Sequence, residues 1–310
     1  MPPKTDILVT VFGAGGFLGR YVTQSLLKTG VRVRAAERDP RRAFYLKPLG
    51  PLGQFQAGRA DVADKASVVA AVQGADAVIN LVGILKGNFQ RVHVDGARNI
   101  AEAAAAAGVS SLVHVSAIGA DPEAESVYGR TKGEGEAAVR AAFPAATIIR
   151  PSITFGQEDN FINRFARMAR LMPVLPVLRP AWKLQPVHAA DLGKAIALAA
   201  LDPGAFAGET YELGGPNVMT MAELNKWVCE QTGRQRAVAE LPDALGKLIP
   251  RLGGWAPGAP LTWDQWLMMG RDNVASGPGF EAFGLHPAPL AAVAPAWLVP
   301  FRKHGRFAKA

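Results

Sequence analysis

Cysteine is nearly absent from the chain, with Cys229 the single example among 310 residues. One thiol excludes an internal disulfide and cannot supply the ligands of a cysteine-built zinc or iron–sulfur site. The sequence also lacks the run of roughly 18–20 apolar residues that a membrane-spanning helix needs. If the protein takes part in redox metabolism, we expect it to carry no metal centre that transfers electrons.

Targeting signals and repeats are missing as well. Residues 1–6 contain neither the apolar segment of a secretory signal nor the length and arginine/serine bias of a transit peptide. We therefore expect the fold to begin close to residue 1 and the protein to stay in the compartment where it is made. No low-complexity linker interrupts the chain.

The composition is that of a globular protein, with 49% hydrophobic and 19% charged residues. A chain of this length can bury one large α/β core and a smaller lobe. The net charge of +8 suits nucleic acid, anionic lipid or an acidic protein partner. Because no recognised RNA-binding module is present, nucleic acid is not an expected partner.

A glycine-rich turn near the N-terminus organises the rest of the sequence. The apolar run 7–12 predicts a buried strand, the spacing Gly13-x-x-Gly16-x-x-Gly19 a tight turn, and residues 17–28 a helix. Backbone N–H groups at such a helix start favour an anion, and missing Cβ atoms let a pyrophosphate approach. The alternative is a turn without a ligand, since Leu18 stands where the G-x-G-x-x-G pattern would need glycine.

Strands and helices alternate through the first half of the chain, which predicts an α/β fold with a Rossmann-type, doubly wound parallel sheet. The expected strands are 7–12, 31–36, 54–60, 77–83, 112–116 and 147–150, and the expected helices are 17–28, 64–73, 90–107 and 128–142.

Beyond Pro151 we expect a smaller C-terminal lobe. The pattern predicts helices over 161–171, 191–200 and 221–233, and a loop punctuated by Pro173, Pro176 and Pro180. We assign residues 1–156 to the dinucleotide-binding domain, with 183–201 returning to it. Residues 157–182 and 202–310 form the smaller domain with a partner-docking tail.

Two charged residues follow the second strand, where a dinucleotide fold reads the adenine ribose. A carboxylate such as Glu37 binds the free hydroxyls of NAD, whereas an arginine such as Arg38 favours the 2′-phosphate of NADP. The alternative is two solvated charges at a strand exit. These two residues therefore do not decide whether the cofactor is NAD or NADP.

Tyr128 and Lys132 are four residues apart on a predicted helix, so their side chains lie on one face and can reach the same ribose. With the glycine triplet and Asp61-Val62, the pair resembles an extended or atypical short-chain dehydrogenase/reductase over about residues 5–200. The resemblance implies that Tyr128 is the general acid/base, that Lys132 binds the nicotinamide ribose, and that Asp61 contacts adenine. It implies these cofactor-binding residues: Gly13, Gly15, Gly16, Phe17, Leu18, Gly19, Glu37, Arg38, Asp61, Val62, Leu81, Val82, Gly83, Ser116, Tyr128, Lys132, Pro151 and Ile153.

The fifth strand departs from this family. There the strand ends in two serines, and the second orients the substrate oxygen. Here Ser116 falls on the first position and Ala117 on the second. Losing one such contact costs on the order of tenfold to a thousandfold in rate. We therefore expect no catalytic residue, with Tyr128 and Lys132 kept to hold the cofactor.

Four stretches carry a closer resemblance: 9–21, 143–165, 184–188 and the segment 270–277. They resemble the nucleotide-binding accessory subunit of respiratory complex I, NADH:ubiquinone oxidoreductase, over nearly the whole chain. That family implies tightly held NADP(H) without turnover, a peripheral position on complex I near the membrane, and a role in stability or assembly. Glu37 departs from it, so NAD(H) stays open. The composition favours a bacterial protein on the cytoplasmic face of the inner membrane, equivalent to the matrix side in a mitochondrion.

The C-terminal half holds all six tryptophans, either in a small aromatic core or, for Trp263, Trp266 and Trp297, on a contact surface. The last residues, 297–309, mix aromatics with four cations. They are either a solvated tail or a segment that docks on an acidic partner or on anionic lipid headgroups. The family resemblance implies other complex I subunits of the peripheral arm as partners. Two further functions stay open: an active NAD(P)-dependent reductase or epimerase, and a redox-sensing or RNA-binding regulator.

Overall fold

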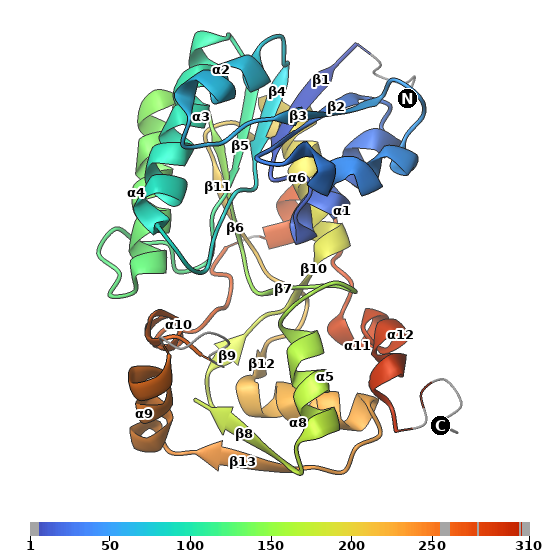
Figure 1. The fold of residues 1–310 in the computed structure, drawn as a ribbon, viewed down its shortest axis with the longest axis vertical. Helices are drawn as coiled ribbons and strands as arrows, with labels where there is room; N and C mark the ends of the chain where they lie inside the picture. The colour runs from blue at the N-terminus through green and yellow to red at the C-terminus, as the bar shows by residue number, and fades with distance from the viewer. Residues whose placement is uncertain (1–5, 255–260, 278, 304, 306–310) are drawn as a thin grey trace. The chain divides into compact units, whose positions relative to one another are not determined.

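The computed structural model describes residues 6–254, 261–277, 279–303 and 305 (Figure 1). The chain divides into two compact units. Unit 1 consists of residues 1–151, 189–213 and 276–285, and unit 2 of residues 152–188, 214–275 and 286–310.

Unit 1 is built on a seven-stranded sheet in the order β11-β6-β5-β4-β1-β2-β3, with every neighbouring pair parallel. This confirms the predicted Rossmann-type sheet, and the carboxyl ends of its strands meet at one edge. The strands are β1 (Leu8–Phe12), β2 (Arg32–Glu37), β3 (Phe55–Arg59), β4 (Ala77–Asn80), β5 (Ser111–Val115), β6 (Thr147–Pro151) and β11 (Thr210–Leu213).

Helices of unit 1 form two groups, which Figure 1 shows on the two faces of the sheet. One group packs α1 (Phe17–Lys28) against α6 (Ala189–Leu201), and the other packs α2 (Lys65–Val72), α3 (Gly96–Ala106) and α4 (Val127–Ala142) in a row. The stripe Ala97, Ile100, Ala101 and Ala104 faces the core because these residues recur at helical spacing. The short elements are η1 (Pro40–Leu49), η2 (Gln90–Asp95), α7 (Pro203–Phe206) and η3 (Gly279–Phe283).

Segments from late in the sequence complete unit 1. Strand β11 pairs with β6, where Arg150 bonds the Glu136 carboxylate at 2.7 and 2.9 Å and lies 3.5 Å from Glu212. Glu212 in turn accepts hydrogen bonds from the Ser276 N–H and hydroxyl at 2.9 and 2.8 Å. The prediction that 202–310 belongs to the smaller domain was therefore wrong for 202–213 and 276–285, because strand pairing and this ion network hold them in unit 1. Residues 183–188, which we expected to return, lie in unit 2.

Unit 2 is an assembly of short strand pairs and helices. It contains two parallel pairs, β7 with β10 and β8 with β13, and one antiparallel pair, β9 with β12. Helix α8 packs on β8, β12 and β13, and helix α5 packs on α8 and β8. The elements are β7 (Thr154–Phe155), α5 (Ile162–Leu171), β8 (Val174–Leu178), β9 (Lys183–Leu184), β10 (Val187–His188), β12 (Met219–Thr220), α8 (Met221–Gln231), β13 (Ala237–Leu241), α9 (Asp243–Gly253), α10 (Trp263–Met268), α11 (Leu290–Val293), α12 (Pro295–Leu298) and η4 (Val299–Phe301).

The expected proline loop at 173–180 was wrong in part, because residues 174–178 form strand β8. Pro176 is tolerated there since β8 pairs only with β13, and an edge strand can lose one N–H donor. Trp266 is buried and Trp297 packs against Phe155 and His188, so these two rings belong to the core of unit 2. Trp263 is 36% exposed. Within the described ranges, no helix combines the length and apolar character needed to cross a bilayer.

Candidate functional site

The glycine turn has the close backbone packing that a phosphate cradle requires. Gly13 has φ +82°, its N–H donates to the Ala36 carbonyl at 3.3 Å, and its own carbonyl accepts from Gly16 N–H at 3.1 Å. A Cβ on Gly19 would meet the carbonyl oxygens of Gly13 and Ala14, so α1 can start this close to the turn only with glycine there. Phe17 and Leu18 begin the helix, whose first N–H groups lack intrahelical acceptors and can face an anion.

Glu37, at the end of β2, reaches back over this turn. Its Oε1 accepts a hydrogen bond from the Gly15 N–H at 2.6 Å. Burial raises the pKa of the Glu37 carboxyl, while the Gly15 N–H and the charges of Arg42 and Arg38 oppose the shift. The carboxylate is therefore fixed beside the glycines, with two arginines nearby, where an adenosine ribose would be read.

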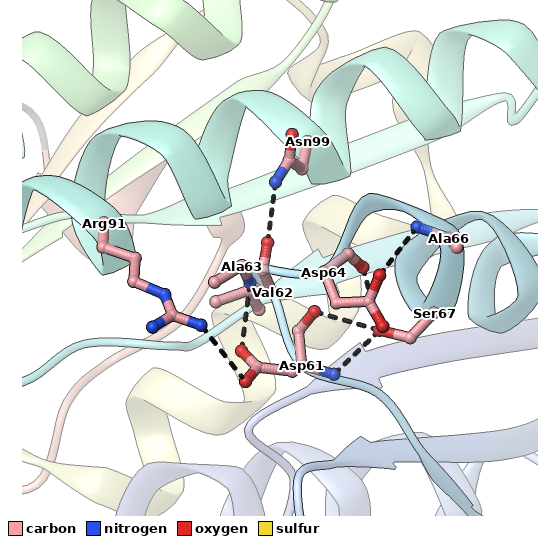
Figure 2. A network of polar contacts seen from close by, with 8 residues as sticks. All are labelled: Asp61, Val62, Ala63, Asp64, Ala66, Ser67, Arg91 and Asn99. Atoms are coloured by element: carbon pink, nitrogen blue, oxygen red, sulfur yellow. Dashed lines mark hydrogen bonds and ion pairs between the residues drawn. The ribbon is translucent and has the colours of Figure 1, made fainter.

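Asp61 is held at the carboxyl end of β3 by its own turn (Figure 2). Its Oδ1 accepts from the Ala63 N–H at 3.0 Å, and its backbone N–H donates to the Ser67 hydroxyl at 3.0 Å. The Arg91 guanidinium lies 4.0 Å from Oδ2, and both side chains are largely exposed. This carboxylate is thus oriented by the backbone and open to a ligand.

Val62 links the same turn to helix α3. Its carbonyl accepts from the Asn99 amide at 2.9 Å, as Figure 2 shows. Gly96, the first residue of α3, packs so closely that a Cβ there would lie 2.7 Å from the Val62 side chain. The turn therefore has little freedom to move away from α3.

The segment after β4 lies beside the glycine turn. The Leu81 N–H donates to the Phe12 carbonyl at 3.0 Å, and the Val82 N–H donates to Asn80 Oδ1 at 3.0 Å. A Cβ on Gly13 would lie 3.4 Å from Leu81 and Val82. The predicted residues Leu81, Val82 and Gly83 are thus brought to the same edge of the sheet as the glycines.

His93, which the sequence reasoning missed, fastens this segment to α4. Its Nε2 accepts from the Ile84 N–H at 3.0 Å, and its Nδ1 lies 3.0 Å from the Thr131 hydroxyl. Burial, together with the charge of Lys132, lowers the pKa of His93 to about 3. The neutral ring therefore carries its proton on Nδ1 and donates it to Thr131. A lone histidine between two valines gave no signal of this role in the sequence.

Lys132 is fully enclosed, although its charge would favour water. Its ammonium donates to the Val115 carbonyl at 2.7 Å, and burial lowers its pKa to about 8 while Glu136 opposes the shift. Tyr128 lies one helical turn earlier, half-buried, with its ring 5.4 Å from that of His93 and 6.3 Å from that of Phe89. The pair predicted from the sequence therefore stands on a helix face that is packed on this part of the site.

Two buried polar atoms beside Lys132 have no hydrogen-bond partner within the described residues. One is the Ser116 hydroxyl. The other is His114 Nε2: the Asn80 amide donates to Nδ1 at 3.0 Å, which leaves the ring proton on Nε2. Burial, and then the charge of Lys132, lowers the pKa of His114 well below its usual value. Ala117 follows directly and brings no hydroxyl.

The last two predicted residues fall in different units. Pro151 ends β6 in unit 1 and its carbonyl accepts from the Ile118 N–H at 3.2 Å. Ile153 lies in unit 2, where its N–H donates to Asn273 Oδ1 at 2.9 Å. The Ser152 hydroxyl lies 2.7 Å from the same oxygen, so Asn273 anchors the start of unit 2. The structure therefore gathers every predicted residue except Ile153 on unit 1.

Comparisons with known proteins agree with this arrangement. A family model described as NAD(P)H-binding matches residues 13–160. The mouse protein "NADH dehydrogenase [ubiquinone] 1 alpha subcomplex subunit 9, mitochondrial" is 37% identical over 298 residues, covering 92% of this chain and 78% of that protein. The Neurospora crassa NADH-ubiquinone oxidoreductase 40 kDa subunit is 31% identical over 312 residues, covering 96% of this chain and 80% of that protein.

Among solved structures, the Escherichia coli NADPH-dependent quinone oxidoreductase complexed with NADPH superimposes with a TM-score of 0.77 at 25% identity, covering 94% of this chain and 99% of that one. The chain therefore contains a nicotinamide-nucleotide-binding domain, and most of the matched residues lie in unit 1.

Proposed function

The chain belongs to the family of complex I accessory subunits that includes mouse subunit 9 and the Neurospora 40 kDa subunit, and we propose that it is a nucleotide-holding structural subunit of NADH:ubiquinone oxidoreductase. The observation that carries the proposal is that the sequence similarity to those subunits extends over nearly the whole chain. It therefore includes both units and not the dinucleotide-binding unit alone. Its role would be to support the stability or assembly of the complex.

The residues at the sheet edge fit a dinucleotide. The glycine turn would receive the pyrophosphate, since α1 begins directly after it without a side-chain cap and its first N–H groups can face an anion. The nicotinamide half would contact Lys132, Tyr128 and Ser116. A polar ligand atom would stabilise the buried Lys132 ammonium and the buried Ser116 hydroxyl by hydrogen bonding. A bound nicotinamide supplies hydride transfer chemistry.

In our proposal the dinucleotide acts mainly as an internal brace. A ligand that binds only the folded state stabilises it by about 4 kcal/mol at a thousand times its dissociation constant, without any chemistry. Ala117 supports this reading, since it offers no hydroxyl to orient a substrate oxygen.

We propose NADP(H) as the resident nucleotide, on the strength of Arg38 and Arg42 beside the ribose-reading position. Glu37 argues for NAD(H), because its carboxylate would face a 2′-phosphate. The nucleotide that leaves the native protein on denaturation, identified by mass and absorbance, decides between them. NADP or NADPH is expected, and NAD or NADH would contradict this choice.

Loss of the chain tests the structural role directly. In cells that lack it, we expect the amount of assembled complex I to fall while the residual complex keeps its turnover per assembled enzyme. The measurement is native electrophoresis with subunit quantification, alongside NADH:ubiquinone activity. A normal amount of complex in the absence of this chain, or a wild-type chain absent from the purified complex, would overturn the proposal.

We further propose a peripheral position near the membrane, among other subunits of the peripheral arm, on the cytoplasmic face in a bacterium and on the matrix side in a mitochondrion. The basic C-terminus is the proposed contact to anionic headgroups. Arg302 donates to the Gln231 carbonyl at 3.3 Å in unit 2, whereas Arg306 and Lys309 lie outside the described residues. Flotation with anionic vesicles, compared between the full chain and a chain ending at residue 301, tests this contact.

A reductase is the second candidate, favoured by the retained Tyr128 and Lys132. A hydride-transfer assay with a panel of carbonyl and quinone substrates separates the two functions. Turnover that disappears in Tyr128→Phe would replace the structural reading with the catalytic one. Absence of turnover supports the structural role, whereas turnover equal in both proteins would show only that Tyr128 takes no part in it.

A further inference from the structure

A part of unit 1 beside the candidate cofactor site exposes several large apolar side chains. Element η1 and the residues after it bury Ala43 and Leu46 completely. They leave Phe44 45%, Tyr45 42%, Leu49 37% and Leu52 fully exposed. We call this the η1 surface, made of Arg41, Arg42, Phe44, Tyr45, Lys47, Leu49 and Leu52.

The aromatic rings of this surface are accompanied by cations. In a 3₁₀ helix, side chains three residues apart lie one above the other, so Arg41, Phe44 and Lys47 form a row. The Lys47 ammonium lies 4.2 Å from the centre of the Phe44 ring, and the Arg20 guanidinium of α1 lies 4.8 Å from that of Tyr45. Such contacts hold the rings in place at a small energetic gain.

The charge of the η1 surface is strongly one-sided. Residues 38–52 contain four cations and one carboxylate, Asp39. That carboxylate is already bound by Arg41, whose Nε and Nη2 lie 2.9 Å from its two oxygens. Within the described part of the chain, Lys47 makes no ion pair. The surface therefore presents uncompensated positive charge among exposed rings.

On the basis of the proposed function, we propose that the η1 surface docks on an acidic surface of a neighbouring protein subunit of the complex. Ordered aromatic and arginine side chains are the groups that carry most of the binding energy at protein interfaces. Charge complementarity selects a partner rich in carboxylates. A lipid surface fits less well, because an interfacial helix needs one continuous apolar face, whereas the row of Arg41, Phe44 and Lys47 places a cation on either side of the ring.

The position of the surface ties docking to the nucleotide. The Arg42 carbonyl lies only 2.8 Å from where a Cβ on Gly15 would stand, so η1 forms a wall of the glycine turn. Glu37, whose carboxylate holds the Gly15 N–H, experiences the charge of Arg42 as well. A subunit bound to the η1 surface would therefore border the adenine end of the nucleotide.

The experiment replaces the native gene with variants and measures the share of the chain that enters complex I. Phe44→Glu places a carboxylate in the middle of the surface, and Lys47→Glu reverses one of its free charges. Val69→Glu is the matched control, because Val69 is equally exposed on α2 of the same unit. The purified variants are compared by melting temperature and by nucleotide binding, which we expect to be unchanged.

We expect Phe44→Glu and Lys47→Glu each to lower the incorporated share about tenfold, and Val69→Glu to leave it unchanged. Raising the salt concentration should increase the release of wild-type chain from the purified complex by a larger factor than it increases the release of Lys47→Glu, since that variant has lost part of the charge attraction that salt screens. Normal incorporation of Phe44→Glu, or a loss with Phe44→Glu but none with Lys47→Glu, overturns the acidic-partner proposal. Failure of the wild-type chain itself to enter the complex overturns the proposed function, and this inference with it.

Discussion

The two ends of the candidate nucleotide site are built in opposite ways. The pyrophosphate end consists of backbone, and works because Gly13, Gly15, Gly16 and Gly19 have no side chains. The nicotinamide end consists of buried polar side chains, among them Lys132 and His93 with depressed pKa values. The pyrophosphate end depends on the absence of Cβ atoms, and the nicotinamide end depends on polar side-chain atoms whose burial costs free energy.

This difference separates two kinds of physical cost. Added bulk damages the glycine end at any pH, whereas acidity and charge removal act on the nicotinamide end. A chain that had given up its nucleotide would gain stability by replacing the buried ammonium, so the presence of Lys132 is itself an argument for a bound partner.

Gly19→Ala should have the largest effect. The new Cβ would meet two backbone carbonyl oxygens that cannot rotate away, which we expect to cost about 3 kcal/mol of unfolding free energy and to abolish measurable nucleotide binding. Chemical denaturation and fluorescence titration with NADPH provide the measurements. Gly58→Ala is the control, since its Cβ would enter open space. Equal stability of the two variants would contradict the close-packed turn.

The second largest effect should be a loss of unfolding free energy on acidification, caused by His93 at the nicotinamide end. The unfolded chain binds a proton at His93 near pH 6.5, whereas the folded chain resists protonation until about pH 3. The unfolded state therefore binds more protons in between, and unfolding free energy falls by about 2 kcal/mol from this group between pH 7 and 5. Denaturation at both pH values should show a shallower fall in His93→Asn than in the exposed-site control His286→Asn. Parallel curves would exclude the role of His93.

Lys132→Met should separate stability from binding. Burial depresses the pKa of the lysine from 10.5 to about 8, which corresponds to about 3 kcal/mol of cost at neutral pH. Removing the ammonium removes this cost, but it also leaves the Val115 carbonyl without its donor, which destabilises the variant by about 1–2 kcal/mol. We expect nucleotide-free protein to be about 1–2 kcal/mol more stable and to bind NADPH at least about tenfold more weakly. Lys28→Met, on the exposed surface of α1, should change neither quantity.

Glu37→Gln should have the smallest effect. The amide oxygen can still accept the Gly15 N–H, while the negative charge facing a 2′-phosphate is lost. We expect the ratio of NADPH to NADH affinity to rise about tenfold, equivalent to about 1.4 kcal/mol. Titrations with both nucleotides measure the ratio, with Asp39→Asn as the control. A ratio unchanged by Glu37→Gln would show that this carboxylate does not read the ribose.

Much of unit 1 could be predicted from the sequence. The glycine turn and helix 17–28 depend on neighbouring residues, and the structure shows them as expected. Parallel strands such as β4 and β5 are buried along their whole length and mostly apolar, because both faces of the sheet are covered. Local pattern and tertiary environment agree in these segments.

The failures share a physical cause, which is distance along the chain. Nothing near Glu212 indicates that Ser276 will bond its carboxylate, and nothing near Ile84 indicates that His93 will accept its N–H. Strand β8 was missed because prolines locally favour a loop, while its partner β13 follows some sixty residues later. The binding roles of the predicted nucleotide residues stay predictions.

Residues 276–285 complete the first unit only after the chain has built most of the second. During synthesis, the ribosome must therefore deliver nearly the entire polypeptide before Glu212 can receive Ser276 and before Phe283 can stack 4.6 Å from Phe206. A product that ends before residue 276 would lack both contacts, even if it extends past residue 213 and contains all seven strands. Closure of the first unit therefore requires translation to continue through residue 285, long after its last strand, β11, has been made.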